Sequence, residues 1–288
     1  MAATQAEKGE RFRRLHRSGC FVIPNPWDAG SAALLANLGF QALATTSAGV
    51  AFQMARPDGA DRVSRAEMLE NARQIVEATD LPVNADLEDG FGPKPEDAAR
   101  TIREAAAVGL VGGSIEDSTR GGDAPVYEIA LAADRVRAAA EAAHALPFPF
   151  MMVGRAENYI HGRYDLADTI RRLQAYQEAG ADVLYAPGLR TRDEVASVVK
   201  SVDRPVNVVM GPGRSSVADL AALGVRRVSV GGSLYRAAIA GFLKAARELK
   251  EQGSFGYAAD ATSHAELTAI FTRTAMSPPV TGGEDVSG

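Results

Sequence analysis

Short apolar runs alternate with longer amphipathic segments along most of the chain. The apolar runs predict strands near Phe21 to Pro24, Ala42 to Thr46, Pro82 to Asp86, Gly109 to Glu116, Phe148 to Arg155, Val183 to Ala186, Val206 to Met210 and Val228 to Gly231. The segments between them are rich in Ala, Glu and Arg, and they predict helices near residues 29–38, 64–78, 95–108, 127–144, 166–178, 191–202, 217–223 and 233–252. Such an alternation is typical of repeated βα units that build a parallel sheet.

The number of these units predicts the fold class. Eight strands and eight crossover helices over about 250 residues are the count of an α/β, (β/α)8 TIM-type barrel. The chain has 288 residues, 46% of them hydrophobic, which is enough to fill one large core. We therefore predict a catalytic barrel domain over residues 1–255.

The end of the chain predicts an addition to this barrel. Residues 258–275 predict one more helix, within a C-terminal helical extension over residues 256–276. Its apolar residues need a surface to cover them, either on the same barrel or on a partner subunit, and we expect a homodimer or homotetramer. Residues 277–288 are polar and rich in Gly and Pro, so they predict a flexible tail.

Composition excludes several classes of partner. The net charge is −5, and no run of Lys or Arg builds a phosphate-binding stripe, so we expect no nucleic acid. No apolar stretch approaches the roughly 20 residues that span a bilayer, and residues 1–14 lack the apolar core of a signal peptide. We expect no membrane association and a cytoplasmic location. The lone Cys20 excludes an intrachain disulfide and fits a reducing compartment.

Four acidic residues lie at or just beyond the ends of apolar runs. Asp86 and Glu88 are two residues apart on an extended segment, so their carboxylates project to the same side. Glu116 ends the next predicted strand and Arg155 the one after it, while Asp58 lies between the second and third. Catalytic groups of a TIM-type barrel lie at the carboxyl ends of its strands, so we expect these side chains to converge there.

This cluster predicts a metal site. Four acids at one barrel mouth would repel each other without a cation. Oxygen ligands without a Cys/His cluster favour Mg2+, with Mn2+ as the alternative, over zinc. An arginine beside them suits the acid group of a small carboxylate or phosphonate substrate.

Six motifs carry a resemblance to a known family. They are Arg56-Pro57-Asp58-Gly59, Asp86-Leu87-Glu88-Asp89-Gly90-Phe91-Gly92, Ile115-Glu116-Asp117, Gly154-Arg155-Ala156-Glu157, Tyr176-Gln177-Glu178-Ala179-Gly180-Ala181-Asp182 and Pro205-Val206-Asn207-Val208. Together, and in this order, they resemble the isocitrate lyase/phosphoenolpyruvate mutase superfamily over about residues 12–255.

The resemblance implies a set of site residues. It implies that Asp86 contacts Mg2+ directly, and that Asp58, Glu88 and Glu116 hold the water shell of the ion. It also implies that Arg155 binds a substrate acid group and that the backbone of Thr46, Ser47 and Ala48 cradles a carboxylate. We assign catalysis to Arg155, Glu116 and Asp58, and add Asn207 and Trp27 to the substrate-binding residues.

The loop after Ile115-Glu116-Asp117 departs from the family pattern. The lyases of the family carry a Cys-Gly-His motif there, and the mutases and phosphonopyruvate hydrolases carry a longer loop with a Lys and an Asn or Thr. Residues 118–126 contain no Cys, His, Lys or Asn. The chain is therefore most similar to the phosphonomutase-like branch. Arg120 and Asp123 are candidates for a short lid, while Tyr159 and His161 are candidates for proton transfer.

Three hypotheses of function follow. The first is a Mg2+-dependent lyase or decarboxylase that acts on a small 2-oxo or 2-hydroxy carboxylic acid through a pyruvate-type enolate. The second is a phosphonopyruvate mutase or hydrolase, which breaks a P–C bond. The third is a catalytically silent relative that binds a metabolite, since an intact acidic cluster without the loop residues is what a decayed enzyme would retain.

Overall fold

Eight short parallel strands form the centre of the molecule. The computed structural model describes residues 3–59, 62–119, 121, 124–210, 213 and 215–275. The strands are β1 (Phe21–Ile23), β2 (Leu43–Ala44), β3 (Val83–Asp86), β4 (Gly112–Glu116), β5 (Met151–Arg155), β6 (Val183–Tyr185), β7 (Val206–Val209) and β8 (Arg227–Ser229). Their order in the sheet is β1-β8-β7-β6-β5-β4-β3-β2, and every paired neighbour is parallel.

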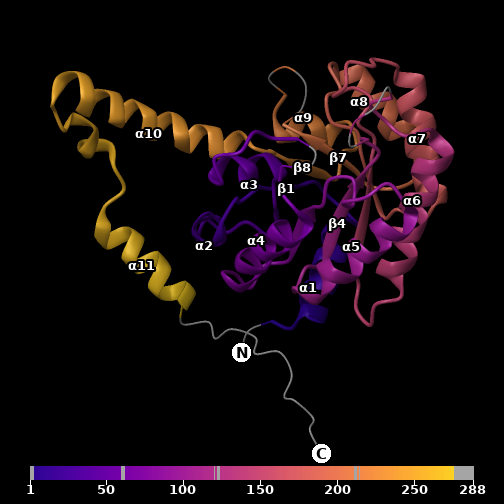
Figure 1. The fold of residues 1–288 in the computed structure, drawn as a ribbon, viewed down its shortest axis with the longest axis horizontal. Coiled ribbons are helices and arrows are strands. Elements are labelled where there is room, and N and C mark those ends of the chain that lie inside the picture. Colours follow the sequence, from indigo (N-terminus) through magenta and orange to yellow (C-terminus); the bar gives the residue numbers. More distant parts are fainter. Residues whose placement is uncertain are drawn as a thin grey trace, which may run out of the picture.

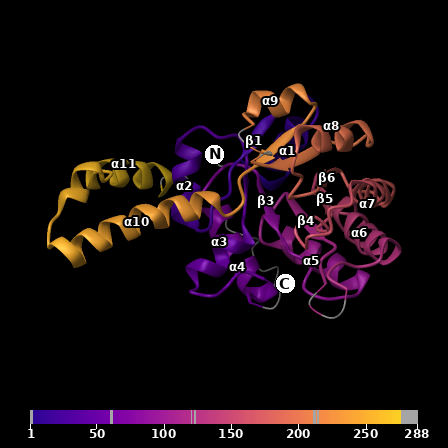
Figure 2. The same ribbon diagram turned by 90° about the horizontal axis from the view of Figure 1, so that it is seen from above.

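This sheet curls into a nearly closed barrel, so the predicted fold class is confirmed. The Ala44 N–H donates to the Pro24 carbonyl at 3.0 Å, which joins the β2 edge to the chain just after β1. Helices surround the strands, as the view from above in Figure 2 shows. Because all strands run in the same direction, their carboxyl ends meet at one mouth.

The helices follow the predicted alternation. They are α1 (Gln5–Leu15), α2 (Ala29–Asn37), α3 (Ser47–Gln53), α4 (Arg65–Glu77), α5 (Pro95–Ala107), α6 (Ile129–His144), α7 (Leu166–Glu178), α8 (Arg192–Lys200), α9 (Val217–Ala222), α10 (Ser233–Gln252), the short 3-10 helix η1 (Gly256–Asp260) and α11 (His264–Ala275). Ser64 and Glu67 form a capping box at the start of α4. Asp28 caps α2 in the same way.

Helix α1 was not predicted, and it covers the amino end of the barrel. Its Phe12 is completely buried and packs against Gly112 of β4. A Cβ at Gly112 would lie only 2.9 Å from the Phe12 ring, so the close contact requires glycine there. His16, just after the helix, is also buried and packs edge-on against Phe12 and Phe21. These contacts close the barrel opposite the strand carboxyl ends.

The C-terminal region differs from the prediction. A single helix over residues 258–275 is wrong, because the chain forms η1, leaves helical geometry at Ala261 and starts α11 at His264. The Ser263 hydroxyl accepts the Glu266 N–H at 3.2 Å, so this residue acts as an N-terminal cap that favours a new helix start. The tail at 277–288 lies outside the described residues.

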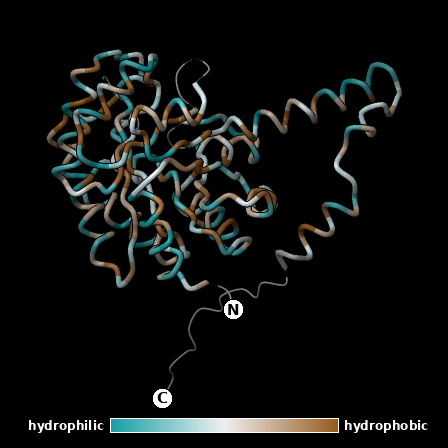
Figure 3. The backbone as a smooth tube through the Cα atoms, turned by 180° about the vertical axis from the view of Figure 1, so that it is seen from behind, coloured by the Kyte–Doolittle hydropathy of each residue, from teal (hydrophilic) through white to brown (hydrophobic). Residues whose placement is uncertain are grey.

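Helix α10 projects away from the barrel, and α11 returns toward α2 (Figure 1). None of the residues of α10 is buried. Hydrophobic positions nevertheless recur along it, as the brown bands in Figure 3 show. Phe242 in this helix exposes 66% of its surface, and Phe255, just after the helix, exposes 69%. An apolar helix face without cover on the same chain is characteristic of an interaction surface.

Candidate active site

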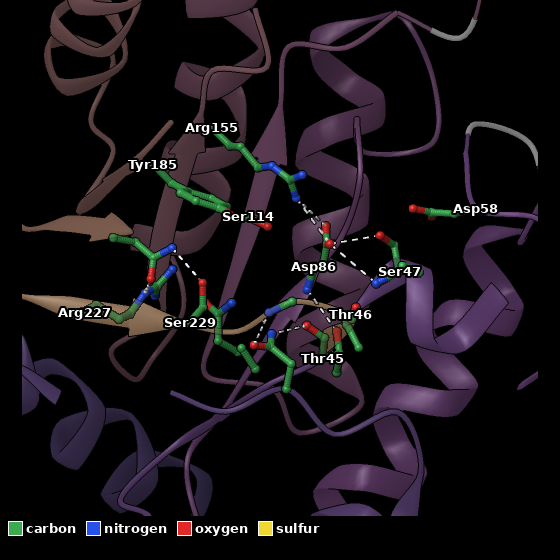
Figure 4. Close-up of a pocket in the computed structure, with 17 residues that line it drawn as sticks. Thr45, Thr46, Ser47, Asp58, Asp86, Ser114, Arg155, Tyr185, Arg227 and Ser229 are labelled. Atoms are coloured by element: carbon green, nitrogen blue, oxygen red, sulfur yellow. Dashed lines mark hydrogen bonds and ion pairs between the residues drawn. The ribbon is translucent and has the colours of Figure 1, made fainter. Parts of the chain in front are cut away.

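Asp86, the last residue of β3, lies at the centre of the strand ends. Its backbone N–H donates to the Thr45 hydroxyl at 3.0 Å, and its Oδ2 accepts the Ser47 hydroxyl at 3.0 Å. The Ser47 N–H points at the same oxygen from 3.5 Å. The segment from β2 into α3 therefore fixes the direction of the Asp86 carboxylate, and Figure 4 shows these contacts.

Arg155, the last residue of β5, reaches across the mouth to Asp86. Its Nη1 lies 3.3 Å from both Asp86 carboxylate oxygens and 3.3 Å from Glu116 Oε2. Its guanidinium also lies over the Tyr185 ring, 5.1 Å from the centroid. Burial alone would lower the pKa of Arg155, but Glu157, Glu116 and Asp86 raise it well above the usual value. Arg155 is thus held as a permanent cation.

The tightest partner of Arg155 is a residue that the sequence did not single out. Glu157 is buried, and its Oε1 accepts Arg155 Nε at 2.5 Å. The Glu157 N–H donates in turn to Asp117 Oδ1 at 2.7 Å, and Asp117 Oδ2 accepts Arg172 Nη1 at 3.0 Å. A buried charged network therefore stands behind the guanidinium and fixes its orientation. The sequence signal was the Arg-x-Glu spacing, which places both residues on the same side of the strand end.

The other three predicted acids occupy different positions around Asp86. Glu116 contacts Arg155, and burial raises its pKa well above the usual range, although Arg155 opposes the shift. Glu88 is buried with a left-handed φ of 48°, and its N–H donates to Asp86 Oδ1 at 3.3 Å. Asp58 stands apart from Asp86 in Figure 4. Partial burial and the charge of Asp86 raise the pKa of Asp58.

A polar pocket of about 160 Å3 opens between these groups. Seven of the predicted site residues line it: Thr46, Ser47, Ala48, Asp58, Asp86, Arg155 and Asn207. Among the described residues, Glu88, Glu116 and Trp27 are not part of its lining. Trp27 instead packs edge-on against Tyr235 at 5.3 Å, so its predicted place in the pocket wall differs from the structure.

Thr46 and Ser47 line the pocket, and their side chains also form hydrogen bonds that stabilise the local fold. The Thr46 hydroxyl caps α3 by accepting the Gly49 N–H at 3.4 Å. Ser47 is directed at Asp86, as described above. Asn207 is also held at both ends, since its Oδ1 accepts Arg227 Nε at 2.9 Å and its Nδ2 donates to the Ser229 hydroxyl at 3.0 Å.

The loop after β4 carries a contact to the loop after β5. Ser118 Oγ lies 3.0 Å from His161 Nε2, and Ser118 forms an isolated bridge with Val126. His161 therefore lies beside this loop. Tyr159 is buried, and its hydroxyl donates to Glu194 Oε1 at 3.0 Å. The two candidate lid residues, Arg120 and Asp123, lie outside the described residues.

The donor set in the pocket suits a hard cation. Asp86 and Asp58 both line the pocket and offer carboxylate oxygens, and neither Cys nor His is among its described lining residues. Across the described residues, no three His, Cys, Asp or Glu side chains stand close enough to ligate one ion together. Carboxylate oxygens of the kind that Asp86 and Asp58 offer fit Mg2+, which takes oxygen ligands and keeps several of its waters.

The chain has clear relatives. A family model for phosphoenolpyruvate phosphomutase matches residues 12–250. A crystal structure from Burkholderia cenocepacia J2315, provisionally assigned as a lyase/mutase, is 54% identical, with a TM-score of 0.90 over 93% of this chain and 96% of that one. Oxaloacetate decarboxylase of Chromohalobacter salexigens is 32% identical over 83% of this chain and 84% of its own length.

A third relative has been solved with ligands. The structure of phosphonopyruvate hydrolase in complex with oxalate and Mg2+ has a TM-score of 0.85 and 26% identity, over 95% of this chain and 97% of that one. The described residues contain no helix that is long and apolar enough to cross a membrane.

The family match covers the whole barrel, including the ends of β3, β4 and β5. The chain belongs to the phosphoenolpyruvate phosphomutase family, within the isocitrate lyase/phosphoenolpyruvate mutase superfamily.

Proposed function

We propose that the protein is a Mg2+-dependent carbon–carbon lyase or decarboxylase that acts on a small 2-oxo or 2-hydroxy carboxylic acid. The observation that carries this proposal is the pairing of Arg155 with Asp86 in a polar pocket of about 160 Å3. A cationic side chain and a metal-ligating carboxylate side by side suit an acid that binds through two oxygens. The similarity to oxaloacetate decarboxylase supports the same chemistry.

Asp86 is the direct metal ligand in this proposal, and Asp58, Glu88 and Glu116 orient the waters around the ion. When bound, Mg2+ would stabilise the negative charge that develops on the substrate carbonyl oxygen as a bond at C3 breaks. Glu88 serves through its position, since its N–H holds Asp86 Oδ1 at 3.3 Å. Mn2+ offers a similar preference for oxygen ligands and would substitute.

Arg155 binds and orients the acid group of the substrate. Its charge persists at any working pH, because the neighbouring carboxylates raise its pKa. Glu157 and Glu116 restrict the guanidinium from two sides, at 2.5 Å and 3.3 Å, so the acid group meets a rigid partner. Pre-organised charge of this kind costs little reorganisation during the reaction. In this proposal the backbone of Thr46, Ser47 and Ala48, which line the pocket, would receive a carboxylate.

A phosphonopyruvate mutase or hydrolase is the second candidate. The similarity to phosphonopyruvate hydrolase with oxalate and Mg2+ favours it. The sequence of residues 118–126 weighs against it, because this loop has Thr119 but neither the Lys nor an Asn expected for P–C chemistry. The cysteine of the lyases is missing from the same loop, so isocitrate cleavage by the usual route is not proposed either.

One experiment separates these reactions. We would incubate the protein with Mg2+ and a panel of 2-oxo and 2-hydroxy di- and tricarboxylates plus phosphonopyruvate, and follow pyruvate and phosphorus signals by NMR. Pyruvate formed from a carboxylate, and lost with EDTA or with Asp86→Ala, is the expected result. Phosphate released from phosphonopyruvate alone would replace the lyase with the hydrolase. Binding without any chemical change would favour the silent relative.

We also propose that the protein is a homodimer or homotetramer. Residues 256–276 are taken as a helical extension outside the catalytic barrel of residues 1–255. The unburied helix α10, with Phe242, Leu243 and Leu249 exposed, is the surface that supports this proposal. Because these side chains are already partly covered, burying the rest of each would contribute about 0.6–2 kcal/mol, which is the exposed fraction of the value for full burial.

A further inference from the structure

Arg227, the first residue of β8, is a buried positive charge without a negative partner in the described parts of the chain. Its side chain points into the barrel and is only 3% exposed. Nε donates to Asn207 Oδ1 at 2.9 Å, but Nη1 is buried and has no hydrogen-bond partner among the residues that the structure describes. In the described part of the chain, no Asp or Glu forms an ion pair with it. Figure 4 shows Arg227 near Ser229 in the pocket.

An arrangement of this kind is costly. A buried charge needs an opposite charge or a full set of hydrogen bonds, and the cost of leaving it unpaired amounts to several kcal/mol. Burial lowers the pKa of Arg227 to about 10, and Tyr185 is the one neighbour that opposes the shift. On its other side stands His16, whose own pKa is lowered to about 3 by burial and by Arg227. Neither neighbour supplies a negative charge at neutral pH.

Arg227 shares its pocket with the proposed metal site. The pocket of about 160 Å3 is lined by Asp86 and Arg155, which end their strands, and by Arg227, which begins its strand. It therefore runs from the mouth toward the amino end of the barrel. The inside of a TIM-type barrel is usually filled by branched apolar side chains. Here the lining between the two charged ends is largely polar, with Asn84, Ser114, Asn207 and Ser229.

Two buried polar atoms of this lining lack partners among the described residues, and they need opposite ones. Asn84 Oδ1 is an acceptor, which a donor such as water satisfies, whereas Arg227 Nη1 is a charged donor. Water alone satisfies a donor such as Arg227 Nη1, but water does not neutralise its charge. A carboxylate does both, since it accepts hydrogen bonds from a guanidinium and balances the charge.

We propose that Arg227 forms a second anion subsite at the inner end of the pocket, and that this subsite takes the carboxylate of the substrate that is remote from the metal. The inference rests on the proposed function and deepens it, because it names the substrate class. The preferred substrate is a dicarboxylate: one acid group lies at Asp86 and Arg155, and the other at Arg227. Asn207 positions the guanidinium, since its Oδ1 fixes Nε.

A matched pair of ligands tests this subsite. Malate and lactate carry the same 2-hydroxy acid group, and malate adds a second carboxylate. We would measure their affinities by calorimetry with Mg2+, using the wild type, Arg227→Met and Arg227→Lys. The control is Arg226→Met, because Arg226 is the neighbouring residue on the outside of the barrel, where it donates to the Gly19 carbonyl at 3.2 Å.

The wild type should bind malate more tightly than lactate. Arg227→Met should weaken malate at least about 30-fold, the low end for truncating one member of a buried charge pair, and leave lactate within about twofold. Arg227→Lys should retain part of the preference, and Arg226→Met all of it. Unchanged lactate binding in Arg227→Met also shows that the variant is folded.

Two results would overturn the subsite. In the first, the wild type binds lactate and malate equally well. The metal-dependent function would then stand without the subsite. The other is a loss of malate and lactate affinity together in Arg227→Met with a native circular dichroism spectrum, which would make Arg227 a structural residue. If malate, lactate and oxalate all fail to bind in the presence of Mg2+, the proposed function fails together with the subsite.

Discussion

His16 makes the stability of the fold sensitive to acid. The ring is buried between Phe12 and Phe21, with centroids at 4.7 and 5.0 Å, and Nδ1 is bound to the Phe12 carbonyl at 2.8 Å. Nε2 has no partner among the described residues. Burial, together with the charge of Arg227, lowers the pKa of His16 from 6.5 to about 3. The folded protein therefore holds this side chain neutral over a range where the unfolded chain takes up a proton.

The sign and size of the effect follow from linkage. Between about pH 6.5 and pH 3 the unfolded state binds more protons, so stability is lost as the pH falls through this range. At pH 5 the loss from this one group is about 2 kcal/mol, and over the whole range it approaches about 5 kcal/mol. Stabilities of single domains are about 5–15 kcal/mol, so this loss is a large fraction of the total.

Urea denaturation at a series of pH values from 8 to 5 measures this loss. His16→Leu removes the titrating group and should flatten the fall in the free energy of unfolding by about 2 kcal/mol at pH 5, whatever its stability at pH 8. His264→Leu, in the exposed first turn of α11, is the matched control and should retain the wild-type slope. Equal slopes for wild type and His16→Leu would refute the reasoning and place the acid sensitivity elsewhere.

Three further substitutions test the site, the packing and the oligomer. Glu157→Gln keeps the size of the side chain but removes the charge 2.5 Å from Arg155, so kcat/KM should fall about tenfold while the Tm changes little; an unchanged kcat/KM contradicts this positioning role. Gly112→Ala places a Cβ 2.7 Å from Asn84 Oδ1 and should cost about 1–3 kcal/mol in denaturant unfolding, whereas Gly241→Ala, with open space around it, should be neutral or stabilising. Phe242→Glu should shift the molecular mass in light scattering toward the monomer, and an unaltered mass would exclude this face from the interface.

The barrel and the position of its charged mouth were predictable because both depend on local patterns. Apolar runs that end in acids mark the strands, and parallel strands bring these ends together. Asp86 and Arg155 therefore meet as predicted, at 3.3 Å. The capping box at Ser64 and Glu67 fixed the start of α4 for the same reason, since a cap is formed by residues three apart.

Other parts depend on contacts between distant residues and were not predictable. The first turns of the chain form α1, whose place under the barrel is set by Phe12 against Gly112. Trp27 follows β1 at the mouth, but its ring turns to Tyr235 on α10, over two hundred residues away in sequence. The inward direction of Arg227 was also missed. Its signal was the alternation of Arg227, Val228 and Ser229, in which polar residues on a short strand share one face.

The closed floor beneath the barrel has a consequence for the sequence of events in turnover. Helix α1 covers the amino end, with Phe12 and His16 packed against it, and Arg227 lies on that side of the pocket. A pocket with one entrance releases the group nearest the entrance before the group that lies deeper. For the dicarboxylate proposed above, the fragment nearest the mouth would leave first after bond cleavage, and the fragment at Arg227 would leave last. The floor would thereby impose an ordered release of products, independent of their relative affinities.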